Sequence, residues 1–526
     1  MMKSIACVVV CLLFATFTAH AQGVGSSGEI TGTVADSTGG VLPKATVNVI
    51  DVQTGLKRPA TMNSTGQFRV TGLSPATYDV SAEMAGFATQ IRKGVTVAIG
   101  QTVVSDFKLK PSQVATVVEV TDQPPVVETE RGSQADQISQ QYIADLPIDR
   151  RDYLTFTLLA PGVSDSTRLA GDQDFRVKQT PQSGLSFYGS NGRGNSITVD
   201  GGETSGDSGG VRLTVSQDDV QEFQINRSNY GADLGGATGA SINIVTKSGT
   251  NNVHGGLYGF FRDDAMDAQN PFSFTQPLQP GQAFDPLTQT ELFGSPVKDT
   301  LTRQQFGGTL GFPIKKDKTF LFLAFEGLRQ NAQNAVPLLT DTNIFEPTAA
   351  QNAILAALAA QGSTLVTCSA GQPQIPANVC AGALQGILTV GTSPTIDPAV
   401  SATQAALNTF LQNQFETEGG LFPYDTREYL AETRLDHRFD ANNELSVTYR
   451  YGHDLEESPD VNSLTAFSAG SSIHDYDNTL QASWYRQLNP TTQNEARVQW
   501  TYYSFNVIPN EPAQVGLQIP SFINNV

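Results

Sequence analysis

The sequence predicts a fold dominated by β-structure: an N-terminal β-sandwich, a mixed α/β middle domain, and the first strands of an antiparallel transmembrane β-barrel. Gly (48), Phe (28) and Tyr (14) are plentiful and only 16% of the residues are charged, which suits turn-rich β-structure better than a helical bundle. Short alternating runs separated by turn residues fill the first part of the chain. In the last part, longer runs are joined by connections that alternate between long and short.

Length and charge narrow the function. A chain of 526 residues exceeds the size at which single cores stop growing, about 250–300 residues, so several domains are expected. The net charge of −19, without a visible basic patch, argues against nucleic acid as a partner, because affinity for phosphates comes from clustered Lys and Arg.

Residues 1–21 have the pattern of a secretory signal peptide. Lys3 is followed by an apolar stretch from Ile5 to Phe17 and by the small-x-small sequence Ala19-His20-Ala21. The alternative is a membrane anchor, but the stretch is shorter than the roughly 20 residues that a spanning helix needs. Elsewhere no run is long and apolar enough for such a helix, so insertion of this exported protein into a membrane requires a closed β-barrel.

Four cysteines occur, and two of them fall within the signal peptide. Cys368 and Cys380 remain, twelve residues apart in a polar loop. In an exported protein such a pair indicates a loop disulfide more than a metal site.

The segment 22–111 predicts a small β-sandwich, because its strands are short and closely spaced. Asp36, Gly39, Gly55, Asn63 and Gly66 are among the residues that provide the tight turns. The expected strands share alternating apolar residues, and they cover Ile30–Val34, Ala45–Ile50, Gln67–Val70, Tyr78–Ala82 and Val95–Ile99.

Motifs in this segment resemble the carboxypeptidase regulatory-like domain, a transthyretin-like sandwich grouped with carbohydrate-binding-like folds. The motifs are Gly32-Thr33-Val34, Leu42-Pro43-Lys44-Ala45, Asn63-x-x-Gly66-x-Phe68, Leu73-x-Pro75-x-x-Tyr78 and Ala85-Gly86-Phe87. No His lies between Gln22 and Val253, so the zinc ligands of a carboxypeptidase are absent from this stretch. The resemblance therefore implies an accessory or docking module and not a peptidase.

A β-prone run, Thr116, Val117, Val118, Glu119, Val120 and Thr121, follows the sandwich. Two prolines, Pro124 and Pro125, end it, so it is extended and suited poorly to the centre of a sheet. Two interpretations stay open from the residues alone: a strand that pairs with the free edge of a partner's sheet, or an ordinary linker strand.

The segment 112–252 resembles the plug domain of TonB-dependent outer-membrane receptors, particularly the Oar-like group. The resemblance rests on an ordered series that includes Leu146-Pro147, Tyr188-Gly189-Ser190-Asn191, Thr198-Val199-Asp200-Gly201, Val220-Gln221-Glu222-Phe223, Gly235-Gly236-Ala237-Thr238-Gly239 and Ile244-Val245-Thr246-Lys247-Ser248-Gly249. It implies that Asp200, Gly201, Glu222, Gly235, Gly236, Gly239, Lys247 and Gly249 are plug positions. It also implies that Thr116–Thr121 is a TonB box, the strand offered to a TonB-type energising protein in the periplasm.

From residue 253 the pattern predicts barrel strands of about ten residues, enough for a tilted crossing. Their connections are 40, 4, 98, 4, 22 and 5 residues long, as expected of long external loops and short periplasmic turns. The expected strands are Val253–Arg262, Arg303–Ile314, Thr319–Leu328, Arg427–Phe439, Glu444–His453, Tyr476–Leu488 and Asn494–Phe505.

The two faces of these strands differ in polarity. In 427–439 the charged residues Glu432, Arg434, Asp436 and Arg438 share one face, which we assign to a polar lumen. The opposite faces, apolar and aromatic, are assigned to outer-membrane lipid. Thr319–Phe325 is apolar on both faces and fits this pattern less well. A water-soluble sandwich could show the same alternation, but it would not explain the 98-residue connection.

Seven strands are an odd number, whereas bacterial barrels of this type are even-numbered and closed. Receptors of the resembled family have about 22 strands. We therefore expect this chain to be the N-terminal part of a longer protein.

No enzymatic activity, cofactor or metal site is expected. His254, His437, His453 and His474 lack partners at metal-binding spacing, and no nucleophile motif is present. The function predicted is a TonB-dependent receptor and transporter in the outer membrane, importing an unidentified ligand, with glycans and peptides as candidates. The alternatives are an adhesion or export-coupled structural protein on the same scaffold, and a secreted array of sandwiches.

Overall fold

A computed structural model of the chain describes most of its length. The described residues are 27–112, 117–120, 134–146, 151, 153–165, 185–190, 194–204, 212, 215–231, 234, 236–269, 298, 300–336, 349–368, 373–388, 420–459, 461, 467–489 and 492–510. The predicted signal peptide, Thr116, Thr121 and Gly235 lie outside them. The domain boundaries at 111/112 and 252/253 stay predictions.

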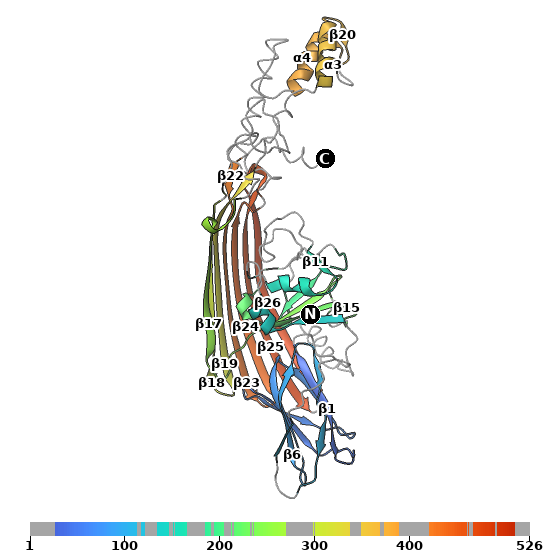
Figure 1. Cartoon of the computed structure of the whole chain (residues 1–526), viewed down its shortest axis with the longest axis vertical. Coiled ribbons are helices and arrows are strands. Elements are labelled where there is room, and N and C mark those ends of the chain that lie inside the picture. The colour runs from blue at the N-terminus through green and yellow to red at the C-terminus, as the bar shows by residue number, and fades with distance from the viewer. Residues whose placement is uncertain are drawn as a thin grey trace, which may run out of the picture.

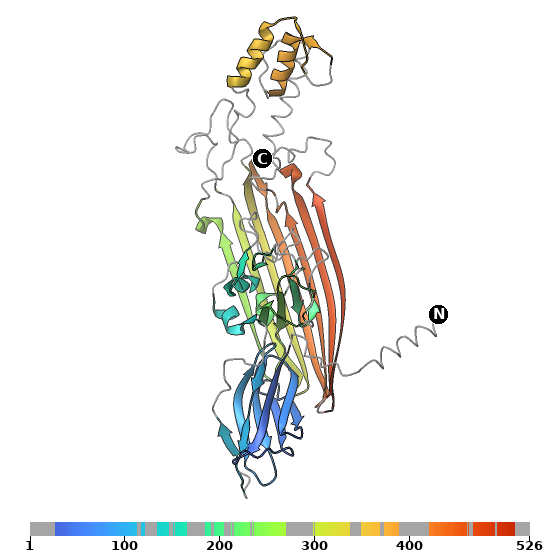
Figure 2. The same ribbon diagram turned by 90° about the vertical axis from the view of Figure 1, so that its right-hand side faces the viewer.

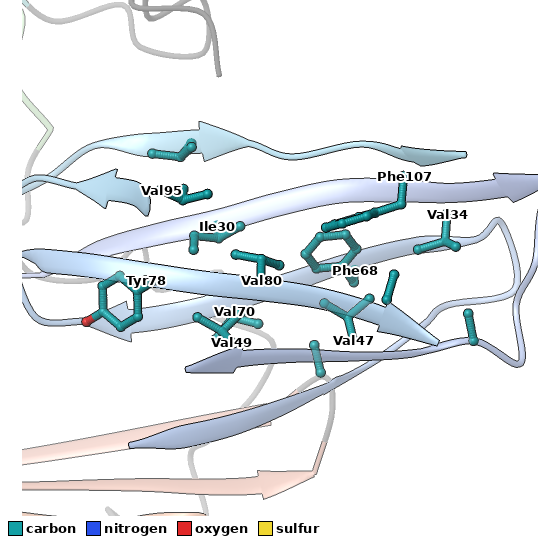
Figure 3. Packing of buried hydrophobic residues seen from close by; sticks show 14 of the residues in the cluster. Ile30, Val34, Val47, Val49, Phe68, Val70, Tyr78, Val80, Val95 and Phe107 are labelled. Carbon is teal, nitrogen blue, oxygen red and sulfur yellow. The ribbon is translucent and has the colours of Figure 1, made fainter. Parts of the chain in front are cut away.

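The N-terminal part is a sandwich of two sheets. One has the order β4-β1-β7, with β8 also paired to β1, and the other has the order β3-β2-β5-β6-β9. The strands are β1 (Gly28–Asp36), β2 (Thr46–Asp51), β3 (Lys57–Thr61), β4 (Gln67–Leu73), β5 (Ala76–Glu83), β6 (Thr89–Val97), β7 (Thr102–Val104), β8 (Phe107–Leu109) and β9 (Val117–Val120). Inward residues such as Ile30, Phe68 and Val80 are almost fully buried between the sheets (Figure 3).

The middle part is built on a five-stranded sheet of order β10-β15-β16-β13-β14. These strands are β10 (Gln134–Ile138), β13 (Ser196–Val199), β14 (Gly202–Glu203), β15 (Val220–Ser228) and β16 (Ser241–Thr246). The helix α2 (Gln140–Asp145), three-residue strands β11 (Val163–Asp165) and β12 (Leu185–Phe187), and 3-10 turns at Tyr153–Leu159 and Gln217–Asp219 accompany it. Phe223, Ile225, Ile242 and Ile244 share one face and have no exposed surface, and Gln224 and Asn243 are buried on the opposite face, so both faces of the sheet are covered.

The last part is one long, curved antiparallel sheet, β17 to β26, whose concave side receives the middle part (Figures 1 and 2). Each of the seven predicted strands is present and continues beyond its predicted last residue, and the first of them begins at His254 instead of Val253. They are β17 (His254–Asp263), β18 (Leu301–Lys315), β19 (Thr319–Val336), β23 (Asp425–Asp440), β24 (Asn443–Glu457), β25 (Ser471–Asn489) and β26 (Thr492–Pro509), and β22 (Gly420–Pro423) pairs with the end of β19.

β19 shows why the strands are longer than predicted. β19 continues to Val336 through the polar run 329–334, where the alternation that marks a membrane strand is lost. Backbone pairing to β18 and β23 nevertheless persists, because Asn331 lies opposite Thr302 and Gln330 opposite Thr426. Pairing of neighbouring strands extends a ladder that hydrophobic patterning alone would end.

The two faces of the long sheet differ as predicted. The outward residues Leu257, Val498 and Trp500 are 92%, 70% and 58% exposed, whereas Glu432 and Asp436 are buried on the inner face. An apolar outer band with Tyr and Trp matches a surface that meets lipid. The apolar residues Phe320, Phe322 and Ala324 on the inner face of β19 are buried, and Ser216 and Gly249 of the middle part contact this strand.

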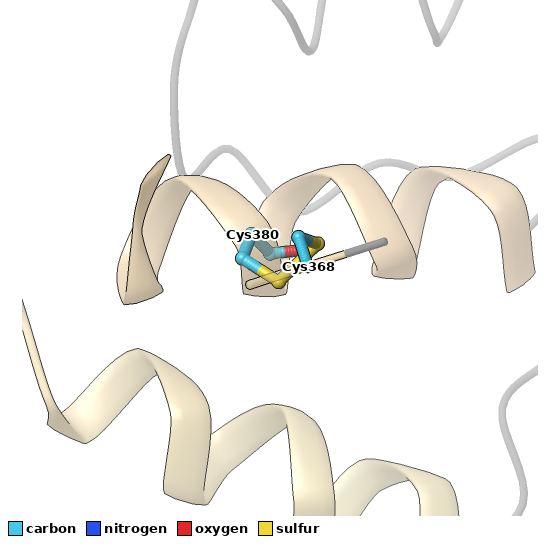
Figure 4. The surroundings of a disulfide bond; sticks show 2 residues. All are labelled: Cys368 and Cys380. Atoms are coloured by element: carbon cyan, nitrogen blue, oxygen red, sulfur yellow. A yellow bond between two sulfur atoms is a disulfide. The ribbon is translucent and has the colours of Figure 1, made fainter. Parts of the chain in front are cut away.

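A small helical unit is inserted between β19 and β22, at the end of the sheet far from the sandwich (Figures 1 and 2). It consists of α3 (Ala349–Ala360), α4 (Ala377–Leu388) and the short strands β20 (Leu365–Val366) and β21 (Ile375–Pro376). Cys368 and Cys380 form a disulfide that ties the segment before β21 to α4 (Figure 4). None of the helices in the described part of the chain has the length and apolarity to cross a membrane.

Candidate functional site

Asp200 is the centre of the contact between the middle part and the inner wall. It lies in the turn between β13 and β14 with φ of 50°, a conformation that Asp adopts more readily than most residues. The backbone N–H and the hydroxyl of Thr246 both donate to its carboxylate, at 2.9 Å each. Arg450 and Arg434, from β24 and β23, form ion pairs with the same carboxylate.

Each arginine of this network also has an acidic partner on the wall. Arg450 pairs with Glu432 at 2.8 Å and Arg434 with Asp436 at 3.1 Å. Burial alone would raise the pKa of Asp200, but the two arginines and the hydrogen bonds from Thr246 hold it below its usual value. The ionised carboxylate therefore attaches the middle part to the wall.

Gly201 and Gly249 allow the middle part to approach the wall. A Cβ on Gly201, whose φ is 78°, would collide with the guanidinium of Arg497. A Cβ on Gly249 would lie 2.6 Å from the backbone carbonyl oxygen of Leu321 on β19. At Gly249 only glycine fits, because two backbones come this close, and at Gly201 the positive φ favours glycine.

Three further predicted plug positions are Gly236, Gly239 and Lys247. Gly239 packs against the side chain of Asn195, and Gly236 has φ of 87° with open space around it. The backbone N–H of Lys247 donates to the carbonyl oxygen of Asp219 at 2.7 Å, and burial lowers the pKa of its ammonium group. A direct role for these residues in binding stays a prediction.

A second set of wall contacts surrounds Glu326, on the inner face of β19. Ser216 donates to its carboxylate at 2.9 Å, Tyr258 at 2.5 Å and Gln305 at 2.9 Å. Arg151 lies 3.7 Å from the same carboxylate. Glu326 thus joins β17, β18 and β19 to the middle part.

Glu222 connects the middle part to the sandwich. Its carboxylate accepts hydrogen bonds from the backbone N–H of Ile99 and, at 2.9 Å, from Gln137. Gln224 donates to the Ile99 carbonyl oxygen at 3.2 Å, so both backbone groups of Ile99 are held by β15. Burial raises the pKa of Glu222 to about 7, although the hydrogen bonds from Ile99 and Gln137 oppose that rise.

This pKa makes the contact sensitive to pH. A carboxyl pKa that is higher in the folded state contributes stability that is complete below its unfolded value of 4.5 and is lost as the pH rises through about 7. We expect wild type to lose about 2 kcal/mol through this group between about pH 5 and pH 8, and the uncharged Glu222→Gln variant to lose that part of the dependence. Denaturant unfolding in detergent at both pH values measures it. Equal pH dependence of the two proteins would contradict the assignment.

The sandwich also contacts the short turns of the long sheet (Figure 1). Arg58 donates to Glu444 at 2.8 Å and lies 4.4 Å from the ring centre of Tyr485. Asn251, just before β17, donates its backbone N–H to the carbonyl oxygen of Gln53 in the sandwich at 3.1 Å and exchanges hydrogen bonds with Asp317 at 2.6 and 2.8 Å. The sandwich is therefore fixed at the end of the sheet that carries the short turns.

The predicted TonB-box segment lies on the sandwich. Its described residues, Val117–Val120, form β9, which pairs in parallel with β6, Val117 opposite Thr89 and Val120 opposite Arg92. The segment thus occupies the edge of the chain's own sheet. The residues alone suggested a partner's sheet edge or a linker, and the backbone pairing adds this third arrangement.

Sequence reasoning found Asp200 and Glu222 through family motifs but missed the groups that hold them. Arg450, which pairs with Asp200, and Ile99, which donates to Glu222, belong to no plug motif. A usable signal was present for Arg450, since it is a charged residue on the lumenal face of β24. Such a residue needs a partner in the lumen.

The fold and these contacts define an outer-membrane β-barrel protein: an apolar outer face, a polar inner face, and a folded domain attached inside by buried ion pairs. Within the described residues, no group of His, Cys, Asp or Glu is arranged to hold a metal ion. The chain belongs to the family described as outer membrane beta barrel domain, whose model matches residues 245–525. Residues 29–110 match the carboxypeptidase regulatory-like domain, in agreement with the resemblance of the sandwich motifs.

Parts of the chain are also similar to a curated protein and to solved structures. The TonB-dependent transporter Oar of Myxococcus xanthus is 26% identical over 310 residues, which are 57% of this chain and 26% of that protein. The chain thus spans about a quarter of the length of that relative. The outer membrane transporter YddB of Escherichia coli matches with a TM-score of 0.41 and 11% identity, over 70% of this chain and 39% of YddB. A ferric enterobactin receptor mutant of Pseudomonas aeruginosa matches with a TM-score of 0.35 and 14% identity, over 70% of this chain and 40% of the receptor.

Proposed function

We propose that the protein is a TonB-dependent outer-membrane receptor that imports an unidentified ligand, with glycans and peptides as the candidate classes. The observation that carries the proposal is the position of the middle domain. It lies against the concave, polar side of a lipid-facing sheet and is attached there by Asp200. A domain held in this way blocks a lumen until something moves it, which is the action of a gated transporter.

The segment before the plug, Thr116–Thr121, supplies the point at which force is applied. β9 is an edge strand of the sandwich, and the sandwich lies at the end of the long sheet with the short turns (Figure 1), which is the periplasmic end in barrels of this type. We propose that a TonB-type protein of the periplasm pairs with Thr116–Thr121 by strand addition and pulls on the plug through the chain that connects them. The ligand would bind to the external loops and the plug, and would then pass into the periplasm.

Deletion of residues 116–121 tests the proposal. We expect uptake to be lost and ligand binding at the cell surface to persist, because the segment lies at the periplasmic end. A deletion of Ser37–Gly40, the turn that follows β1 in the sandwich, is the matched control and should leave uptake intact. Normal uptake without residues 116–121 would contradict the mechanism.

One observation favours a second candidate, an adhesion or export-coupled structural protein. The helical unit α3–α4, tied by the Cys368–Cys380 disulfide, stands at the external end of the sheet (Figures 1 and 2). A cross-linked unit in that place could contact a surface outside the cell. Loss of adhesion or secretion in a knockout, with normal uptake of every solute tested, would favour this candidate.

A further inference from the structure

The sandwich presents one of its ends to the wall (Figures 1 and 2). This end includes the turn between β2 and β3 and the first residues of β3. Arg438 of β23 donates to the carbonyl oxygen of Lys57 at 2.6 Å. A Cβ on Gly55 would lie 2.4 Å from Oδ1 of Asp317, in the turn between β18 and β19. The sandwich therefore fits closely against the wall beside two of its short turns.

Arg58 joins two strands of the sandwich to the wall. Its guanidinium donates to the carbonyl oxygens of Thr71 and Gly72 on β4, at 3.2 and 2.8 Å, and to Glu444 of β24 at 2.8 Å. The ring of Tyr485 on β25 packs against this guanidinium, and the Tyr485 hydroxyl donates to the Thr71 carbonyl oxygen at 3.2 Å. Arg58 is only 5% exposed. Without Glu444 the docked sandwich would hold a buried cation that lacks its anion, which strongly disfavours docking.

The turn between β6 and β7 holds the plug. Ile99 lies in this turn and is buried, and its N–H donates to Glu222 while its carbonyl oxygen accepts from Gln224. Glu222 and Gln224 are two residues apart on β15, so they share one face of that strand. The turn is closed by its own hydrogen bonds, because Gln101 donates its backbone N–H to the Ala98 carbonyl oxygen and accepts the Ala98 N–H through its side chain, at 3.1 Å each. Ile99 is thus a fixed part of the sandwich.

These contacts form a second attachment of the plug to the wall, separate from Asp200. The plug is joined to the sandwich at Ile99, and the sandwich is joined to the wall at Arg58 and Lys57. The two contacts are in series, so this route holds the plug only while both are closed. The sandwich contacts the wall through several segments and holds β15 through one turn. The contact with the plug is therefore expected to open first.

We propose that the sandwich is a clamp that holds the plug in its closed position. It is docked on the wall and grips β15 through Ile99, and the plug moves only after Glu222 and Gln224 release that residue. The chain that follows β9 enters the plug at β10, which pairs with β15 and whose Gln137 donates to Glu222 at 2.9 Å. A pull on that chain therefore reaches the clamp directly. The inference rests on the proposed receptor function and gives the N-terminal domain a part in gating.

The first test is hydrogen exchange of the Ile99 amide in the purified full chain, in detergent at a single pH. Glu444→Arg places a second guanidinium against Arg58 and should undock the sandwich, since like charges repel strongly at short range. We expect the Ile99 amide to exchange about tenfold faster, because two linked contacts hold a domain more tightly than one. Glu457→Arg, the same substitution at the other end of β24, is the matched control and should exchange as wild type.

Amides of β24 and β25 show whether the wall is intact, and in Glu444→Arg they should exchange as in wild type. If they exchange faster, Tyr485→Leu takes its place with the same expected result at Ile99, because it removes the ring beside Arg58 without adding a charge. Unchanged exchange at Ile99 with an intact wall, or equal acceleration by Glu457→Arg, would overturn the proposal.

The second test asks whether the two contacts act in series. Entry of a large antibiotic into intact cells should rise in Glu222→Ala and in Glu444→Arg, and the double variant should leak no more than the leakier single variant. Glu444→Arg combined with Asp200→Ala should leak more than either alone, because Asp200 holds the plug by a separate route. Leaks of Glu222→Ala and Glu444→Arg that add fully would also overturn the clamp. Neither readout depends on an energising partner, so its failure is distinct from a failure of the 116–121 deletion to stop uptake.

Discussion

A disulfide between β6 and β9 should abolish uptake until it is reduced. Ile91 and Glu119 lie opposite each other in the parallel pair, and neighbouring strands place Cα atoms within the range that a disulfide spans. In Ile91→Cys/Glu119→Cys the oxidising periplasm would join the two strands. Any pull on the segment would then be carried by the sandwich, and the plug would stay in place. Uptake of the bound ligand with and without reductant measures the effect.

The two single cysteine variants are the matched controls, and each should import at the wild-type rate with or without reductant. Because the single variants retain Cys368 and Cys380, they also show whether reduction of the native disulfide by itself changes uptake. Full uptake by the oxidised double variant, with the cross-link verified by mass, would mean that β9 need not leave β6 for transport.

The reversibility of the pairing follows from its size. β9 contributes four residues to the edge of the sheet, and each net hydrogen bond of such a ladder is worth about 0.5–1.5 kcal/mol. A total of a few kcal/mol therefore holds the segment on β6. A partner protein that offers a longer strand can replace this pairing. The same pairing covers an exposed sheet edge that could otherwise aggregate.

Much of this fold could be predicted from local pattern. Each of the seven wall strands follows from alternation and connection length, because a strand between lipid and a polar lumen repeats every second residue. The short strands β3, β7 and β8 were missed. In β3, Pro59 interrupts the expected β pattern, yet Val47 and Asn48 of β2 pair with its residues Ala60 and Pro59 at the sheet edge.

The contacts of the candidate site could not be predicted in the same way. Asp200 and Arg450 are 250 residues apart in sequence, and Arg58 and Glu444 are 386 apart. The sequence pattern shows that a charged residue faces the lumen. The residue that pairs with it depends on how the plug is positioned against the wall. The helices α3 and α4 were also missed, because the long connection was interpreted as a polar loop although 349–360 is rich in Ala, a strong helix former.

Loss of the Asp200 carboxylate should release the plug more than any other single change in this contact. Asp200→Ala leaves Arg434 and Arg450 buried without their shared partner and removes the acceptor for Thr246. Removing one member of a buried ion pair costs about 3–5 kcal/mol. We expect the lower part of that range, because Asp436 and Glu432 still face the two arginines. Denaturant unfolding in detergent and entry of a large antibiotic into intact cells measure stability and leakage.

A second substitution distinguishes a shared network from general damage. In Asp200→Ala/Arg450→Met the buried cation is removed together with its partner, so the double variant should be less destabilised than the sum of the two single variants. Glu432, which also pairs with Arg450 at 2.8 Å, prevents full recovery because it then loses its own cation. Strictly additive losses would mean that Asp200 and Arg450 stabilise the plug independently, and the ion pair between them would then contribute little to holding the lumen closed.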